Sequence, residues 1–106
     1  MQSKWVQMGS VRRFDEVSAD KAQAIKVLEE AAEVFGAWQI YERSLGIDGY
    51  IDKLGRGKLL DACADLIQAT LNLVAALGVE DFRPYLKACE RRNRERWRIS
   101  DGEVDE

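Results

Sequence analysis

Polar side chains are sparse and regularly spaced along residues 59–77, and the rest of the chain can be understood from this stretch. Its strong polar residues follow one another at intervals of four, three and four: Asp61, Asp65, Gln68 and Asn72. These intervals predict one polar stripe on a helix whose remaining surface is apolar. A helix that is apolar on nearly every side belongs in an interior, so we expect partly buried carboxylates that need a compensating partner.

Apolar residues recur at helical intervals before this stretch. Ile25, Leu28, Ala32 and Phe35 follow at steps of three and four, which predicts an amphipathic helix over about residues 19–43. Ser18 or Asp20 is suited to cap its beginning.

The central helix is expected to begin near Lys58 and to end at Gly78, a typical C-capping residue. A last helix is expected from about residue 81 to residue 98, with Pro84 in its first turn.

The remaining segments are less regular. Residues 1–17 predict a short N-terminal helix or arm, and residues 99–106 a flexible acidic tail. Residues 44–57 hold four of the eight glycines, so we expect a loop with at most one helical turn there. The prediction is a single all-α domain over residues 1–106, a bundle of three long helices plus a short N-terminal helix. The apolar surface of the central helix suggests that oligomerisation completes this bundle.

Composition narrows the chemistry that this chain can perform. The chain has 106 residues, 46% of them hydrophobic, with a net charge of -3 and no histidine. The acidic balance argues against nucleic-acid or acidic membrane partners, and two aspartates in the central helix make membrane crossing expensive. We found no signal peptide pattern and expect a cytoplasmic protein. Without histidine, hydrolysis would rely on carboxylates and a hard metal ion.

Two pairs of carboxylates stand out on the predicted helices. Glu30 and Glu33 are three residues apart, and Asp61 and Asp65 are four apart, so each pair shares one helix face. If the two helices pack antiparallel, four negative charges converge and remain ionised only with cations between them. Mg²⁺ suits such a site, with Mn²⁺ as a substitute. The alternative is a solvated acidic face, with Asp61 favoured by the helix dipole.

The motifs EEAAE and DACAD, over residues 29–33 and 61–65, resemble those of the all-α nucleotide pyrophosphohydrolases of the MazG type. The similarity spans about residues 20–98. It implies that Glu30, Glu33 and Asp65 bind Mg²⁺ and that a nucleoside triphosphate is cleaved between its α and β phosphates. The family has Glu where this chain has Ala62, so Asp61 would have to replace that ligand.

The other candidate residues have ordinary structural alternatives. Glu29 or Glu30 could act as a general base. Candidate substrate-binding residues are Lys26, Trp38, Lys58, Asn72, Arg91 and Arg94. The lysines could neutralise phosphate or cover apolar surface, and Trp38 could stack on a base or lie in the core. Asn72 could bind substrate or a neighbouring helix. The resemblance implies that the arginines lie near the phosphates. The alternative is that the helix dipole alone favours these cations at the C-terminal end of the helix.

Two classes of function follow. The first is a Mg²⁺-dependent hydrolase that converts (d)NTP into (d)NMP and pyrophosphate, with a phosphoribosyl-ATP pyrophosphohydrolase as a close alternative. The second is a non-catalytic helical module that binds a nucleotide or a protein. A homodimer and a homotetramer are both compatible with the apolar surface.

Overall fold

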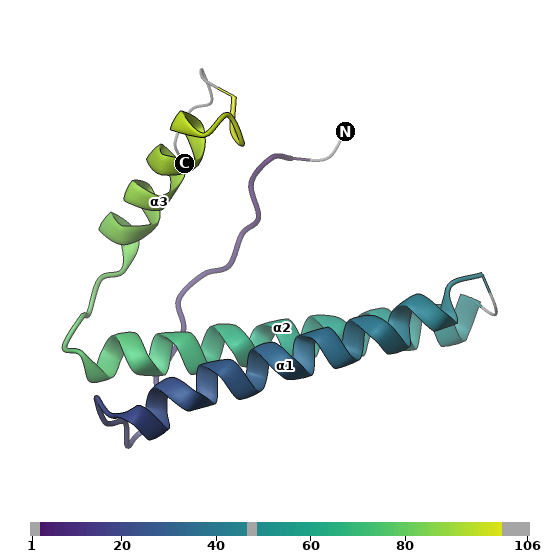
Figure 1. The fold of residues 1–106 in the computed structure, drawn as a ribbon, viewed down its shortest axis with the longest axis horizontal. Helices are drawn as coiled ribbons and strands as arrows, with labels where there is room; N and C mark the ends of the chain where they lie inside the picture. The colour runs from purple at the N-terminus through teal and green to yellow at the C-terminus, as the bar shows by residue number, and fades with distance from the viewer. Residues whose placement is uncertain (1–2, 47–48, 101–106) are drawn as a thin grey trace.

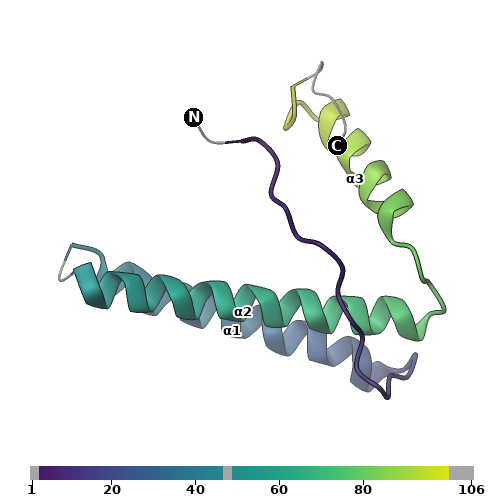
Figure 2. The same ribbon diagram turned by 180° about the vertical axis from the view of Figure 1, so that it is seen from behind.

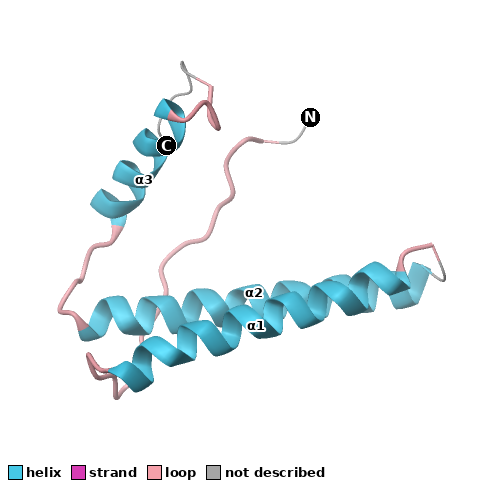
Figure 3. Ribbon diagram, in the orientation of Figure 1, coloured by secondary structure: helices cyan, strands magenta, loops and turns pink. Residues whose placement is uncertain are grey.

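Every regular element in the described part of the chain is a helix. The computed structural model describes residues 3–46 and 49–100 and contains α1 (Lys21–Ser44), α2 (Gly49–Ala76) and α3 (Arg83–Glu95). Figure 3 shows loops and no strand between them. The all-α prediction is confirmed, with three helices rather than four. The predicted tail lies outside the described residues from residue 101 onward.

Local capping signals set three of the helix ends. The Asp20 Oδ1 accepts a hydrogen bond from the Gln23 backbone N–H at 2.9 Å and begins α1. After α2, Gly78 has a φ of 82°, and its N–H donates to the Ala75 carbonyl at 2.9 Å. This left-handed residue ends the helix as predicted. Pro84 lies in the first turn of α3, where its missing N–H costs nothing.

The prediction of a short N-terminal helix is wrong. Residues 3–20 form an extended segment, called the arm below, which crosses α2 near the start of α1 (Figure 1). Its backbone bonds to side chains of α2: the Phe14 N–H donates to the Asn72 Oδ1 at 3.0 Å, and the Gln68 Nε2 donates to the Arg12 carbonyl at 3.0 Å. These tertiary bonds replace those of a helix.

The predicted loop is also largely helical, because α2 begins at Gly49 rather than near Lys58. Gly55 is buried where the two helices approach closely. A Cβ added to it would lie 3.2 Å from the Ser44 Oγ and 3.4 Å from the Tyr41 Cα. Close packing therefore stabilises a glycine-containing segment of low helix propensity. Residues 47–48 lie outside the described residues.

The hairpin of α1 and α2 is antiparallel and packed through small side chains (Figure 1). Its buried residues include Ser44, Ala62 and Ala69. The large apolar side chains that predicted an amphipathic α1 point elsewhere: Leu28 is 70% exposed and Phe35 is 62% exposed. One chain therefore leaves a broad apolar face of the hairpin uncovered.

Among the described residues, α3 packs against neither α1 nor α2, and both views show it leaving the hairpin (Figures 1 and 2). Its residues predicted to face inward are exposed, including Tyr85, Leu86 and Trp97. The accessible surface is 8800 Å², whereas a compact monomer of this mass exposes about 6,000 Å². The radius of gyration is 16.6 Å, against about 13 Å for a compact domain.

Within α2, the segment Lys53–Ala76 contains an 18-residue window with a mean hydropathy of 1.4 and is long and apolar enough to cross a membrane by length and composition alone. The core helix of a soluble protein can have the same length and composition, but here only 17% of the apolar window is buried. Most of this window is therefore at least partly exposed in a single chain, although α1 packs against one side of α2.

Candidate functional site

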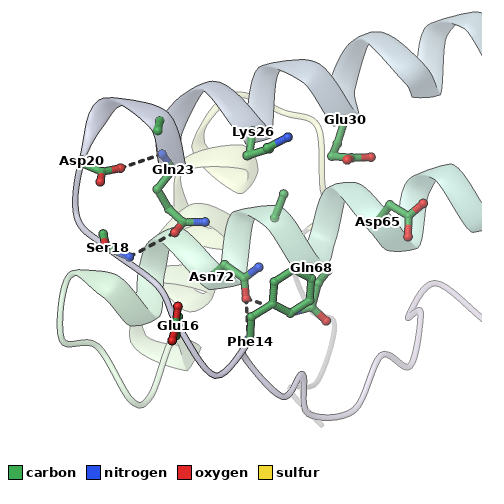
Figure 4. Close-up of a pocket in the computed structure, with 12 residues that line it drawn as sticks. Phe14, Glu16, Ser18, Asp20, Gln23, Lys26, Glu30, Asp65, Gln68 and Asn72 are labelled. Atoms are coloured by element: carbon green, nitrogen blue, oxygen red, sulfur yellow. Dashed lines mark hydrogen bonds between the residues drawn. The ribbon is translucent and has the colours of Figure 1, made fainter.

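A pocket of about 460 Å³ lies between the arm, the first half of α1 and the second half of α2 (Figure 4). Glu30 and Asp65 lie at one end of it, from α1 and α2 respectively. Phe14, Gln23 and Asn72 lie at the other end, beside the arm. Helix pairing and the arm together bring these distant parts of the sequence to one cavity.

The acidic end brings together carboxylates from two helices. The Glu30 Oε2 is buried and has no hydrogen-bond partner among the described residues. Burial raises the pKa of Glu30, and the charge of Glu33, a hydrogen bond with Glu33 and the charge of Asp65 raise it further. Glu33 and Asp65 are exposed, but the charges of both act on the half-buried Glu30. Of the four carboxylates predicted to converge, Glu30, Glu33 and Asp65 thus interact electrostatically, and their role as metal ligands stays a prediction.

These carboxylates could bind a hard cation that needs only one or two protein ligands. No group of three or more Cys, Asp or Glu side chains in the described residues lies close enough to hold a metal ion. Mg²⁺ is commonly held by one or two carboxylates together with water and substrate phosphates, and does not need a complete protein cage. The buried and unpartnered Glu30 oxygen is a suitable ligand for such an ion. A cation there would also relieve the repulsion that raises the pKa of Glu30.

Lys26 supplies a positive charge at the pocket. It lines the cavity, and its charge lowers the pKa of Glu30. The Lys26 Nζ lies 3.0 Å from the Glu29 Oε2, and this hydrogen bond raises the pKa of Lys26. Glu29 itself is exposed and outside the lining of the pocket. Asp61 is likewise exposed and outside it, one turn before Asp65.

Four of the candidate substrate-binding residues lie away from the pocket within one chain. Trp38 is further along α1, with its ring centroid 5.6 Å from that of Tyr41. Lys58 is exposed on α2 outside the lining. Arg91 and Arg94 are on the separate α3, where an Arg94 guanidinium nitrogen lies 3.4 Å from a Glu90 carboxylate oxygen.

Asn72, the remaining candidate, is the most buried polar residue at the pocket, with 2% of its surface exposed. Its Oδ1 accepts hydrogen bonds from the Phe14 N–H at 3.0 Å and from the Gln68 Nε2 at 2.9 Å. Phe14 and Gln23 were not predicted as site residues. Phe14 lies on the extended arm, which has no helical repeat that places it against α2. Gln23 lies in the first turn of α1, and no pattern sets it apart from the other polar residues of that helix.

Comparison of the chain with protein-family models, curated proteins and solved structures found no match. The resemblance to MazG-type enzymes therefore rests on short motifs, and the pocket itself is the main support for a function.

Proposed function

We propose that this protein is a Mg²⁺-dependent, MazG-like nucleotide pyrophosphohydrolase that converts (d)NTP into (d)NMP and pyrophosphate. The observation that supports it most directly is the meeting of Glu30 and Asp65, from two antiparallel helices, in one pocket. Lys26 at the same pocket offers a positive charge to a phosphate group. An acidic pair beside a cation favours a substrate that arrives with a metal ion and a polyphosphate chain.

The proposed roles of the residues follow from their positions. Glu30, Glu33 and Asp65 would hold Mg²⁺ or Mn²⁺, with Asp61 acting through a water molecule. The ion supplies Lewis-acid activation of the phosphate when it is bound. Between the two candidate bases, Glu30 is better placed than Glu29, because Glu29 is paired with Lys26.

A homodimer would complete the protein, with a homotetramer as the alternative. The chain exposes about 2,800 Å² more than a compact monomer of its mass. Covering this excess on both chains of a dimer would bury about 5,600 Å² in total, at the upper end of the range of about 2,000–5,000 Å² or more for obligate dimer interfaces. The exposed Leu28, Phe35 and Leu60 form the surface to be covered. A second copy could also bring Trp38, Lys58, Arg91 or Arg94 to the pocket. We propose a cytoplasmic protein, since this surface is covered by a second copy in place of a lipid bilayer.

A phosphoribosyl-ATP substrate is the closest alternative within the same chemistry. A non-catalytic helical module that binds a nucleotide or a protein is the alternative from another class. Its support is the buried Ala62 at the hairpin interface, where the resembled family has a glutamate. Asp61 is exposed beside it, so a full set of four ligands is not formed in one chain.

The deciding experiment measures pyrophosphate release from a panel of nucleotides, including phosphoribosyl-ATP, with Mg²⁺ or with EDTA. We expect release that depends on Mg²⁺, and a loss of at least about a hundredfold in Asp65→Asn and in Glu30→Gln. Asp81→Asn makes the same chemical change outside the pocket and should retain activity. If no nucleotide is cleaved by the unaltered protein, the enzyme proposal fails. If Asp65→Asn keeps full activity, the proposed site is wrong.

A further inference from the structure

The arm holds two side-chain amides of the pocket in fixed orientations. The Phe14 N–H donates to the Asn72 Oδ1 at 3.0 Å, and the Ser18 N–H donates to the Gln23 Oε1 at 3.2 Å. A backbone N–H can only donate, so in each amide the oxygen must face the arm. The NH₂ groups are then turned away from the arm, as Figure 4 shows for Asn72 and Gln23.

Both NH₂ groups are available to a ligand. Neither the Asn72 Nδ2 nor the Gln23 Nε2 donates a hydrogen bond within the described residues, although Asn72 as a whole is 98% buried. Neither nitrogen is among the fully buried side-chain atoms of the described residues that lack a partner, so each is accessible and can donate to water or to a ligand in the pocket. The arm end of the pocket therefore presents two donors.

The surroundings of these donors favour a flat, uncharged acceptor. The Phe14 ring lines this end and is 59% exposed, which leaves part of its surface open to a planar partner. Glu16 and Asp20 also line it, and their negative charges disfavour a phosphate group there. Lys26 and the acidic end lie further along the cavity (Figure 4). A nucleotide would thus place its phosphates away from the arm.

We propose that the arm end of the pocket binds the nucleobase, with Asn72 and Gln23 donating to its carbonyl oxygens or unprotonated ring nitrogens. Phe14 lies against the face of the base, and the backbone N–H groups of Phe14 and Ser18 act as positioning groups for the two amides. This inference rests on the proposed function in that the ligand is a nucleotide. The inference adds to that function the residues that recognise the base.

Two substitutions distinguish a role in binding the base from a purely structural role of these amides. Asn72→Asp and Gln23→Glu keep an oxygen that accepts from the arm, but each replaces the NH₂ donor with an acceptor. Each should weaken nucleoside binding at least about tenfold, since one donor is lost and a repulsive oxygen faces the base. Phe14→Leu keeps its backbone N–H and removes only the ring. Asn93→Asp makes the same exchange on α3, outside the pocket, and should bind as the unaltered protein does.

The measurement follows the side-chain NH₂ signals of the full chain by NMR, in EDTA, during addition of purine and pyrimidine nucleosides. We expect the Asn72 and Gln23 signals to shift with at least one nucleoside and to stay in place with ribose 5-phosphate. Equal shifts with ribose 5-phosphate, no shift with any nucleoside, or unweakened binding by both amide variants would overturn the inference. Because this readout needs neither metal nor hydrolysis, its result is independent of whether the enzyme proposal stands.

Discussion

Apolar residues make up more than half of α1 and of α2 but only four of the thirteen residues of α3, and among the described residues only the α1–α2 hairpin is packed. Its contact is made by small residues such as Ser44, Ala62 and Ala69, and Gly55 allows the two helices to approach closely. By contrast, α3 contacts neither helix in the described part of the chain, and its Tyr85 and Leu86 are exposed. Small residues on facing helices determine where one chain can pack against itself, while larger side chains remain available for a partner.

The largest effect is expected where the hairpin lacks a partner. Leu28→Glu introduces a charge on the face of α1 that is 70% exposed in one chain. If a second copy buries this face, the dimer dissociation constant should rise at least about a hundredfold. Sedimentation equilibrium measures this change. Val6→Glu, at a 91% exposed position of the arm, is the matched control. Unchanged assembly of Leu28→Glu would show that this face is not an interface.

The second largest effect is expected from Mg²⁺, which should stabilise the hairpin and leave α3 unchanged. An ion held at Glu30 and Asp65 should stabilise the hairpin by about 1.4 kcal/mol at ten times its dissociation constant. Amide hydrogen exchange should slow in α1 and α2 and remain unchanged in α3. Without the ion, the raised pKa of Glu30 means that stability falls as pH rises above 4.5, since the folded state binds the proton more tightly. Glu30→Gln should remove both the stabilisation by Mg²⁺ and this pH dependence. If Mg²⁺ slows amide exchange in Glu30→Gln as much as in the unaltered protein, the proposed metal site is contradicted.

Two glycines on α2 provide a smaller test of the close helix contact. Gly57 has nothing within 4 Å of an added Cβ, so Gly57→Ala should stabilise the helix by about 0.5–1 kcal/mol. Gly55→Ala places its Cβ 3.2 Å from the Ser44 Oγ and should gain clearly less or destabilise the hairpin. Thermal unfolding of both variants measures the difference. An equal gain in both would contradict tight packing at Gly55.

The smallest effect is expected at the start of α3. A hydrogen bond from the Arg83 side chain lowers the pKa of Asp81 from 3.8 to about 2, and the Arg83 backbone N–H contributes to this shift. Because the folded pKa is lowered, the stabilisation is complete above pH 3.8 and is lost as pH falls through about 2. The protection of the first amides of α3, relative to the intrinsic exchange rate at each pH, should therefore fall in acid. In Asp81→Asn this protection should be almost independent of pH in this range, with α1 as the internal reference.

The parts of the fold that were predictable from the sequence depend on local interactions. Asp20, Gly78 and Pro84 act within a few residues of themselves, so their helix ends could be predicted. The arm and the early start of α2 depend on contacts between distant segments. The backbone of Phe14 bonds to a residue 58 positions away, and Gly55 is helical because α1 lies against it.

The candidate site shows the same division. The spacing within each helix predicted that Glu30 and Asp65 could converge, and both line the pocket. The expectation that Asp61 and Asp65 are partly buried is wrong, because both are exposed. Asp61 belongs to the same stripe as Asp65 but lies outside the pocket. Which member of a stripe reaches the cavity depends on the register between the two helices, and spacing within one helix cannot determine it. The orientations of the Asn72 and Gln23 amides depend on hydrogen bonds from the arm, whose position could not be predicted from the sequence.

The most direct test of the shared carboxylate site is the position of a bound metal ion. Crystals soaked with Mn²⁺ and measured for anomalous scattering would locate it. We expect a peak coordinated by both Glu30 and Asp65, at the pocket between α1 and α2. Mn²⁺ bound only elsewhere, with no peak between these two carboxylates, would contradict the proposed metal site and the chemistry assigned to it.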